Sequence, residues 1–168
     1  KTWITERPAI INNRLELGHF EGDTIKGKVS SGSIGTHVER VSGYGLAHLM
    51  HTVSAKTMHE QTVEQFQKIP AAKRLSETDD NGSEFAAFEE TKRALGLAIY
   101  FALPYHSWER GTNENWNGLL RQFFPKGTSF ATLTQADVDE AVRNLNHRPR
   151  KRLNYLSPYE VFVKGKKP

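Results

Sequence analysis

Acidic side chains occur at a turn that directly follows an expected strand. The segment 73–78 is short and lies between Pro70 and Asn81-Gly82, which is the pattern of a strand that runs into a tight turn. The segment 84–95 is rich in helix formers and has acids in its first turn. Asp80 is therefore expected at the carboxyl end of a strand, where open α/β sheets bind their ligands. Taken alone, Asp-Asp-Asn-Gly is more simply interpreted as a plain turn, so other stretches must decide its role.

A second pair of carboxylates lies in the expected strand 19–25. Alternate residues of a strand share a face, so Glu21 and Asp23 should point the same way. Two such carboxylates repel each other unless one is protonated, solvated or bound to a cation. A polar face that meets solvent is the alternative.

A third acid, Glu114, stands near the start of an expected helix that begins at about Asn113. The helix carries an apolar stripe at i, i+3, i+4, i+7 and i+8, made of Trp116, Leu119, Leu120, Phe123 and Phe124. Glu114 lies on the opposite side, together with Asn117, Gly118 and Arg121. The simpler interpretation is that Glu114 only stabilises the helix dipole.

The composition fits one domain. The chain has 168 residues, of which 37% are apolar, and this length allows a sizeable core. The absence of cysteine excludes disulfides and thiolate metal sites, and His37, His48 and His51 lack metal-ligand spacing, so we expect them to be structural or surface residues. No apolar run approaches 18 residues and no secretion signal begins the chain, so neither a membrane partner nor export is expected. The start at Lys1, without Met, suggests a fragment.

Basic charge is concentrated at the carboxyl end. Residues 147–168 carry a net charge of +6, whereas residues 1–146 carry −2. This asymmetry is expected if carboxylates bind cations while a separate patch meets a polyanion such as nucleic acid. A solubilising terminus is the alternative.

The order of expected elements indicates the fold class. Three strands (19–25, 36–42 and 43–53) precede a helix with a capping box at Thr57, a strand that ends at Asp80, a helix after Ser83 and a buried strand over 97–103. Further helices follow, with caps at Thr134 and Ser157. We expect a ribonuclease-H-like α/β fold, with a mixed five-stranded sheet of three antiparallel and then two parallel strands flanked by helices. Residues 1–18 are expected to be an extended lead-in, 19–147 the core, and 148–168 a basic segment packed on it or extending from it.

Together, several motifs resemble the catalytic core of the DDE transposases in the bacterial insertion-sequence family numbered thirty. The resemblance covers nearly the whole chain and rests on the order and spacing of its pieces. The motifs are Glu6-Arg7-Pro8, the segments 18–24, 78–85 and 104–115, Asn117-Gly118-Leu119-Leu120-Arg121, Pro125-Lys126-Gly127 and the segment 145–151.

The resemblance implies a metal-dependent site. The family's three catalytic acids match Asp23, Asp80 and Glu114, with 33 residues between the last two. These acids would bind Mg²⁺ or Mn²⁺, two ions with DNA bound, for 3′-end cleavage by water and then strand transfer by the freed hydroxyl. Asp79 should point to the opposite strand face and be a bystander.

The resemblance also implies DNA as the partner, both element ends and target, with a homo-oligomer acting on DNA in the bacterial cytoplasm. The family's amino-terminal helix-turn-helix region does not precede Lys1, so we expect the core alone. Candidate DNA contacts near Glu114 are His106, Trp108, Arg110, Asn117, Arg121 and Lys126. Candidate phosphate contacts in the basic segment are Arg148, Arg150, Lys151 and Arg152. Loop packing and solvation are the alternatives for these side chains.

Two other functions remain open at this point. A ribonuclease H or junction-resolving nuclease has the same fold, and its fourth acid would come from Glu60 or Glu64. A catalytically silent DNA-binding domain of a decayed element is the alternative from another class, although all three acids are present.

Overall fold

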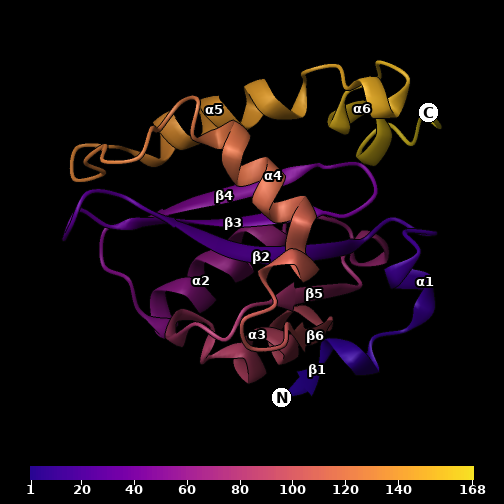
Figure 1. Cartoon of the computed structure of the whole chain (residues 1–168), viewed down its shortest axis with the longest axis horizontal. Helices are drawn as coiled ribbons and strands as arrows, with labels where there is room; N and C mark the ends of the chain where they lie inside the picture. Colours follow the sequence, from indigo (N-terminus) through magenta and orange to yellow (C-terminus); the bar gives the residue numbers. More distant parts are fainter.

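One mixed sheet of six strands, in the order β1-β6-β5-β2-β3-β4, forms the centre of the molecule (Figure 1). The computed structural model describes residues 1–168, apart from the side chain of Ser107. Strands β2, β3 and β4 are antiparallel neighbours, and β5, β6 and β1 run parallel to β2. The strands are β1 Thr2–Trp3, β2 His19–Lys26, β3 Ser33–Glu39, β4 Gly45–Met50, β5 Ser76–Asp79 and β6 Ala98–Phe101. The predicted ribonuclease-H-like order of five strands is confirmed.

The sixth strand differs from the prediction for the first 18 residues. Thr2 and Trp3 pair in parallel with Tyr100 and Phe101, and a short helix, α1 (Ala9–Asn12), follows. Residues 1–18 are therefore not simply an extended lead-in, because they supply an edge strand. A strand of two residues is too short to show alternation, which is why the sequence pattern missed it.

Helices cover both faces of the sheet. The longer helices are α2 Ala55–Phe66, α3 Phe88–Leu95, α4 Gly111–Leu120 and α5 Gln135–Asn146, and a short α6 spans Pro158–Phe162. Figure 1 shows α4 crossing the near face over β2 and β3, with α2 and α3 behind the sheet and α5 along β4. In the part of the chain that the structure describes, no helix combines the length and the apolar character needed to cross a bilayer.

Two helix boundaries differ from the sequence pattern. Helix α2 is capped by Ser54, whose hydroxyl accepts a hydrogen bond from the Thr57 amide at 3.0 Å, so Thr57 is not the cap. Helix α4 ends at Leu120, so the predicted apolar stripe continues through Phe124 in a turn beyond the helix. The predicted capping boxes at Thr134 and Ser157 are confirmed.

Separate apolar cores fill the two sides of the sheet. On the side of α2 and α3, Phe20, Phe66 and Phe101 are fully buried. On the side of α4 and α5, Trp116 and Leu120 pack with residues of β2, β3 and β4. Because α4 is held in this second core, the residues of its first turns have fixed positions above β2.

Side chains of α5 occupy the free edge of β4. Gln135 accepts a hydrogen bond from the Leu49 amide at 2.8 Å and donates one to the Ala47 carbonyl at 3.1 Å. Asn146 accepts from the Gly45 amide and donates to its carbonyl, both at 2.8 Å. These bonds satisfy backbone groups that an edge strand otherwise leaves open to pairing with another chain.

Candidate active site

Asp23 and Asp80 come from neighbouring parallel strands. Strand β2 pairs with β5 from His19 to Glu21, Asp23 lies two residues further along β2, and Asp80 directly follows β5. The side chains of Asp23 and Asp80 keep 26% and 31% of their surface exposed. Two partly accessible carboxylates therefore lie close to the carboxyl ends of neighbouring central strands, as the sequence predicted for Asp80.

Helix α4 orients Asp23. The side-chain amide of Asn117 donates a hydrogen bond to Asp23 Oδ2 at 3.1 Å, and its oxygen accepts one from the Thr36 hydroxyl at 2.9 Å. The Thr24 amide donates to Asp23 Oδ1 at 2.8 Å. Asn117 is buried, and through this hydrogen bond it fixes the orientation of the Asp23 carboxylate.

The turn after β5 holds Asp80. The Gly82 amide donates a hydrogen bond to Asp80 Oδ1 at 2.7 Å, and the Asn81 side chain donates to the Ala102 carbonyl at 2.7 Å. Burial raises the pKa of Asp80, and the nearby Asp23 and Glu84 raise it further, while the Gly82 amide and Arg110 oppose this shift. A cation at this position would relieve the repulsion between the two aspartates.

The guanidinium of Arg110 provides such a positive charge. Its Nη1 lies 3.4 Å from Asp23 Oδ1, and its Nη2 lies 3.7 Å from Asp80 Oδ2. Nη1 also donates a hydrogen bond to the Gly22 carbonyl at 3.0 Å. Arg110 is only 9% exposed, so it lies between the carboxylates and not on the surface where a DNA contact was expected.

Glu114 is placed differently from the two aspartates. It is exposed in the first turn of α4, one helical turn before Asn117. Residues three apart on a helix are neighbours, so Glu114 lies on the side of α4 from which Asn117 reaches Asp23. Among the residues whose side chains the structure describes, no three His, Asp or Glu groups are gathered closely enough to hold a metal ion.

The donor chemistry nevertheless suits a hard divalent cation. Asp23 and Asp80 present carboxylate oxygens, the ligands that Mg²⁺ and Mn²⁺ prefer. Both carboxylates already face one positive charge, because the Arg110 guanidinium stands between them. These two residues therefore fit the implied metal, whereas Glu114 is not gathered with them into a metal-binding group among the described side chains.

Comparison with known proteins places the chain in a family. It is 40% identical over 164 residues to the transposase InsI for insertion sequence element IS30A of Escherichia coli (strain K12), an alignment that covers 98% of this chain and 43% of that protein. It is 41% identical over 160 residues to the transposase for insertion sequence element IS1086 of Cupriavidus metallidurans, covering 95% and 47%. The chain belongs to the IS30 family of transposases. It spans less than half the length of these curated relatives.

A solved structure has the same fold as this IS30-family core. The catalytic core domain of BIV integrase superimposes with a TM-score of 0.67, covering 89% of this chain and 96% of that one at 20% identity. No family model matches the chain. The fold is thus that of an integrase core, which is the ribonuclease-H-like class predicted from the order of elements.

Glu21 in the IS30-family core is neutralised within the protein. It shares a strand face with Asp23, as predicted, but is fully buried. Arg40 donates to Glu21 Oε1, and the Asn113 amide donates to Glu21 Oε2 at 2.8 Å. The repulsion expected between Glu21 and Asp23 is therefore relieved by Arg40 on one side and Arg110 on the other.

Asp79 faces the other side of the sheet from Asp80. A Cβ on Gly22 would lie 2.2 Å from Asp79 Oδ1, so Asp79 fills the space beneath Gly22. Asp79 is 2% exposed, and burial, Glu77 and Asp80 hold its pKa well above the ordinary value. The placement agrees with the prediction that Asp79 points away from the site.

Glu77 lies beside Asp79 beneath Gly22 and belongs to a cluster of buried polar side chains. His37 Nδ1 contacts Glu77 Oε1, and His37 Nε2 lies 3.1 Å from His48 Nε2. Burial raises the pKa of Glu77 to about 8 and lowers that of His37 to about 3, so it favours the neutral form of both side chains. The prediction that His37 and His48 are structural fits this packing.

The remaining predicted DNA contacts are distributed around α4. The His106 and Trp108 rings stack at 4.5 Å in the loop before α4, and Trp108 is 68% exposed. Arg121 donates to the Lys26 carbonyl at 3.0 Å, and Lys126 is exposed. In the basic segment Arg148 donates hydrogen bonds to Gln122 and Asn144, while Arg150 precedes a 3-10 turn over Lys151–Leu153 that contains Lys151 and Arg152.

Proposed function

We propose that this IS30-family core cleaves DNA at a phosphodiester and joins the freed 3′ end to a target, using divalent metal ions at Asp23, Asp80 and Glu114. The proposal rests on the pair Asp23 and Asp80. Both carboxylates lie beside the Arg110 guanidinium at the carboxyl ends of neighbouring strands in an integrase-core fold. Mg²⁺ or Mn²⁺, when bound, would activate the attacking oxygen and stabilise the leaving oxygen.

The protein residues position these groups. Asn117 and the Thr24 amide hold the two oxygens of Asp23, and the Gly82 amide holds one oxygen of Asp80. Glu114 would complete the site by turning from solvent toward Asp23. Because Glu114 is exposed in the first turn of α4, such a side-chain rotation does not require repacking of the core.

Arg110 has a defined place in this proposal. Without a metal ion its guanidinium balances the charge of Asp23 and Asp80. A divalent cation and a guanidinium cannot share this position, because they repel each other at such short range. Arg110 would therefore have to move away from the carboxylates for them to hold a metal ion, and its charge would then be available to a DNA phosphate.

The surroundings of Asp80 support DNA as the partner. A hollow of about 280 Å³ lies beside Asp80 and Arg110, and Tyr105 and His106 contribute to its wall. Tyr105 is 97% exposed, and exposed aromatic rings offer stacking surfaces for bases. Element-end and target recognition, a homo-oligomer on DNA and a cytoplasmic location remain parts of the proposal.

The other nuclease reading gains no support. A fourth acid from α2 would be Glu60 or Glu64, and both are exposed. Glu60 lies 3.9 Å from Lys56 in a surface ion pair on its own helix.

Nicking of supercoiled plasmid in Mn²⁺ tests the proposed function. We expect Asp23→Asn, Asp80→Asn and Glu114→Gln each to lower the rate at least about a hundredfold, since each removes a charge that the metal requires. Asp79→Asn is the matched control and should keep activity, because Asp79 is buried beneath Gly22 on the opposite face of the sheet. Full activity in any of the three variants would remove that residue from the site.

A further inference from the structure

We propose that an arginine-lined hollow on the flank of α4 opposite Glu114 binds the phosphate backbone of the DNA on which the proposed function acts. The hollow has a volume of about 330 Å³, and its lining residues are Arg14, Gly111, Thr112, Asn115 and Arg152. The site rests on the proposed function for the identity of its ligand. It brings together three segments that are far apart in the sequence.

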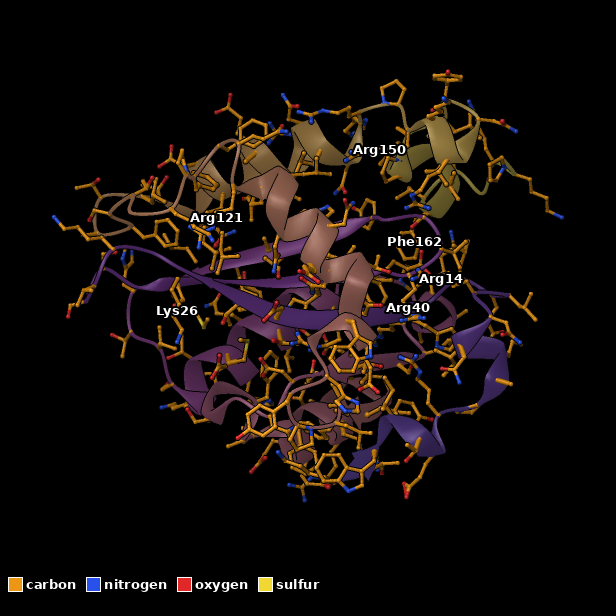
Figure 2. The ribbon with its side chains drawn as sticks, in the orientation of Figure 1. Arg14, Lys26, Arg40, Arg121, Arg150 and Phe162 are labelled. Atoms are coloured by element: carbon orange, nitrogen blue, oxygen red, sulfur yellow. The ribbon has the colours of Figure 1, made fainter. Side chains whose placement is uncertain are left out.

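The geometry of α4 separates this hollow from the catalytic acids. At 100° per residue, Thr112 and Asn115 lie on one side of the helix, roughly opposite Glu114 and Asn117. Figure 2 shows Arg14, Arg40 and Arg150 on one side of α4, and Lys26 and Arg121 on the other. A DNA strand that crosses α4 would meet positive charge on both flanks.

The arginines of the hollow are held by backbone carbonyls. Arg152 Nη1 donates to the Val41 carbonyl at 2.9 Å, and Arg14 Nη1 donates to the Arg40 carbonyl. Gly43 has a φ of +73°, and a Cβ there would lie 2.6 Å from Arg152 Nη2, so this glycine leaves room for the guanidinium. A guanidinium has five N–H donors, so each arginine keeps further donors for a ligand.

The charge of this cluster is not balanced by carboxylates. Among the described residues, Arg14, Arg150 and Arg152 form no ion pair. Burial lowers the pKa of Arg152, and the charge of Arg14 lowers it further. Glu39 opposes this shift, but its oxygens already accept hydrogen bonds from the Gly18, Val41 and Ser42 amides. An anion from outside the chain would relieve the repulsion.

The lining suits an extended polyanion. A second hollow of about 40 Å³ shares Thr112, Asn115 and Arg152 with the first and extends to Arg150. Thr112 Oγ1 is buried there without a hydrogen-bond partner in the described structure. Hydroxyl and amide donors beside several arginines are typical of contacts to successive DNA phosphates. A row of such groups fits a nucleic-acid backbone better than one isolated ion.

Salt dependence of DNA binding tests this site. We would measure binding of a fluorescein-labelled 30-base-pair duplex without metal, from 50 to 300 mM KCl, for the wild type and Arg14→Gln/Arg152→Gln. Loss of two phosphate contacts should lower the slope of log K against log salt by about 2 and weaken binding roughly tenfold or more at the lowest salt. The matched control is Lys92→Gln/Arg93→Gln, because both residues are exposed on α3 behind the sheet.

The possible outcomes distinguish failure of this DNA-binding site from failure of the proposed catalytic function. A shallower slope in the arginine variant alone supports the hollow, and Arg152→Gln by itself should give about half the change if the double variant folds poorly. Equal slopes in the arginine and control variants overturn it, as does a wild type that binds an oligoglutamate peptide but no duplex. Plasmid nicking and Mn²⁺ binding are read separately, so their absence in the wild type contradicts the proposed function and leaves the binding result intact.

Discussion

At the scale of single residues, charge balance explains the arrangement around Asp23. Glu21 and Asp23 share a strand face, and each lies beside an arginine: Glu21 beside Arg40, and Asp23 beside Arg110, which it shares with Asp80. Glu21 is fully buried with its partner, so it is a structural ion pair, whereas Asp23 remains partly open to solvent. The accessible acid is the one available to a metal ion.

The position of Arg110 gives a prediction that a purely structural role would not. Replacing Arg110 with glutamine removes a positive charge that lies 3.4 Å from Asp23 and 3.7 Å from Asp80. We expect Arg110→Gln to bind Mn²⁺ about tenfold or more tightly in the absence of DNA, measured by isothermal titration calorimetry.

The control for this titration is Arg121→Gln. Arg121 contacts the Lys26 and Phe124 carbonyls and no aspartate in the described structure, so its loss should leave the Mn²⁺ affinity unchanged. Weaker binding by Arg110→Gln would show that the guanidinium helps to organise the carboxylates and does not compete with metal.

Sequence periodicity predicted the direction in which the acidic side chains point, but not the groups that contact them. Alternation along a strand placed Glu21 with Asp23, and Asp79 opposite Asp80, and the structure agrees. Arg110 contacts the Gly22 carbonyl across 88 positions of sequence, and such a contact depends on how α4 is docked. Local patterns carry no information on that docking.

At the scale of elements, helix α4 positions the site. Trp116 of this helix packs closely against Gly45, where a Cβ would lie 2.2 Å from the Trp116 Cζ2 atom. Asn113 and Asn117 of the same helix bond Glu21 and Asp23. The apolar stripe predicted the helix and its buried face, whereas the close approach at Gly45 has no signal in periodicity.

Gly45→Ala tests this docking. The added methyl group would push the rigid indole of Trp116 and shift α4, at a cost of about 1–3 kcal/mol in the free energy of unfolding. Urea unfolding should report that loss, and plasmid nicking should fall further than the unfolded fraction explains, because Asn117 moves away from Asp23.

Gly118→Ala in the same helix is the control. Nothing lies within 4 Å of a Cβ at Gly118, so the substitution should stabilise the protein by about 0.5–1 kcal/mol and keep nicking. Equal effects of the two substitutions would contradict a specific role for the contact between Trp116 and Gly45.

At the scale of the whole molecule, the order of elements was the most predictable feature. Three antiparallel strands followed by two parallel strands were expected and are present, and the integrase-core comparison agrees. Strand β1 was missed because two residues carry no pattern. Of the arginines that line the hollow, Arg152 was a predicted phosphate contact and Arg14 was not. Arg14 is distant in sequence, and only the folding of the chain brings it close to Arg152.

The charges of the folded molecule also fit its proposed partner. Asp23 and Asp80, with Arg110 between them, lie beside one flank of α4, and arginines that form no ion pair among the described residues line the other flank. Such a distribution lets one surface hold metal ions while its surroundings attract a polyanion.

The most direct test of the central claim is a Mn²⁺ titration by calorimetry on the wild type, Asp80→Asn and Asp79→Asn, with anomalous diffraction from a soaked crystal. We predict that the wild type and Asp79→Asn bind Mn²⁺, that Asp80→Asn does not, and that the anomalous peak touches Asp23 and Asp80. Binding that survives in Asp80→Asn, or a peak away from both aspartates, would contradict the assignment of this site as the metal centre.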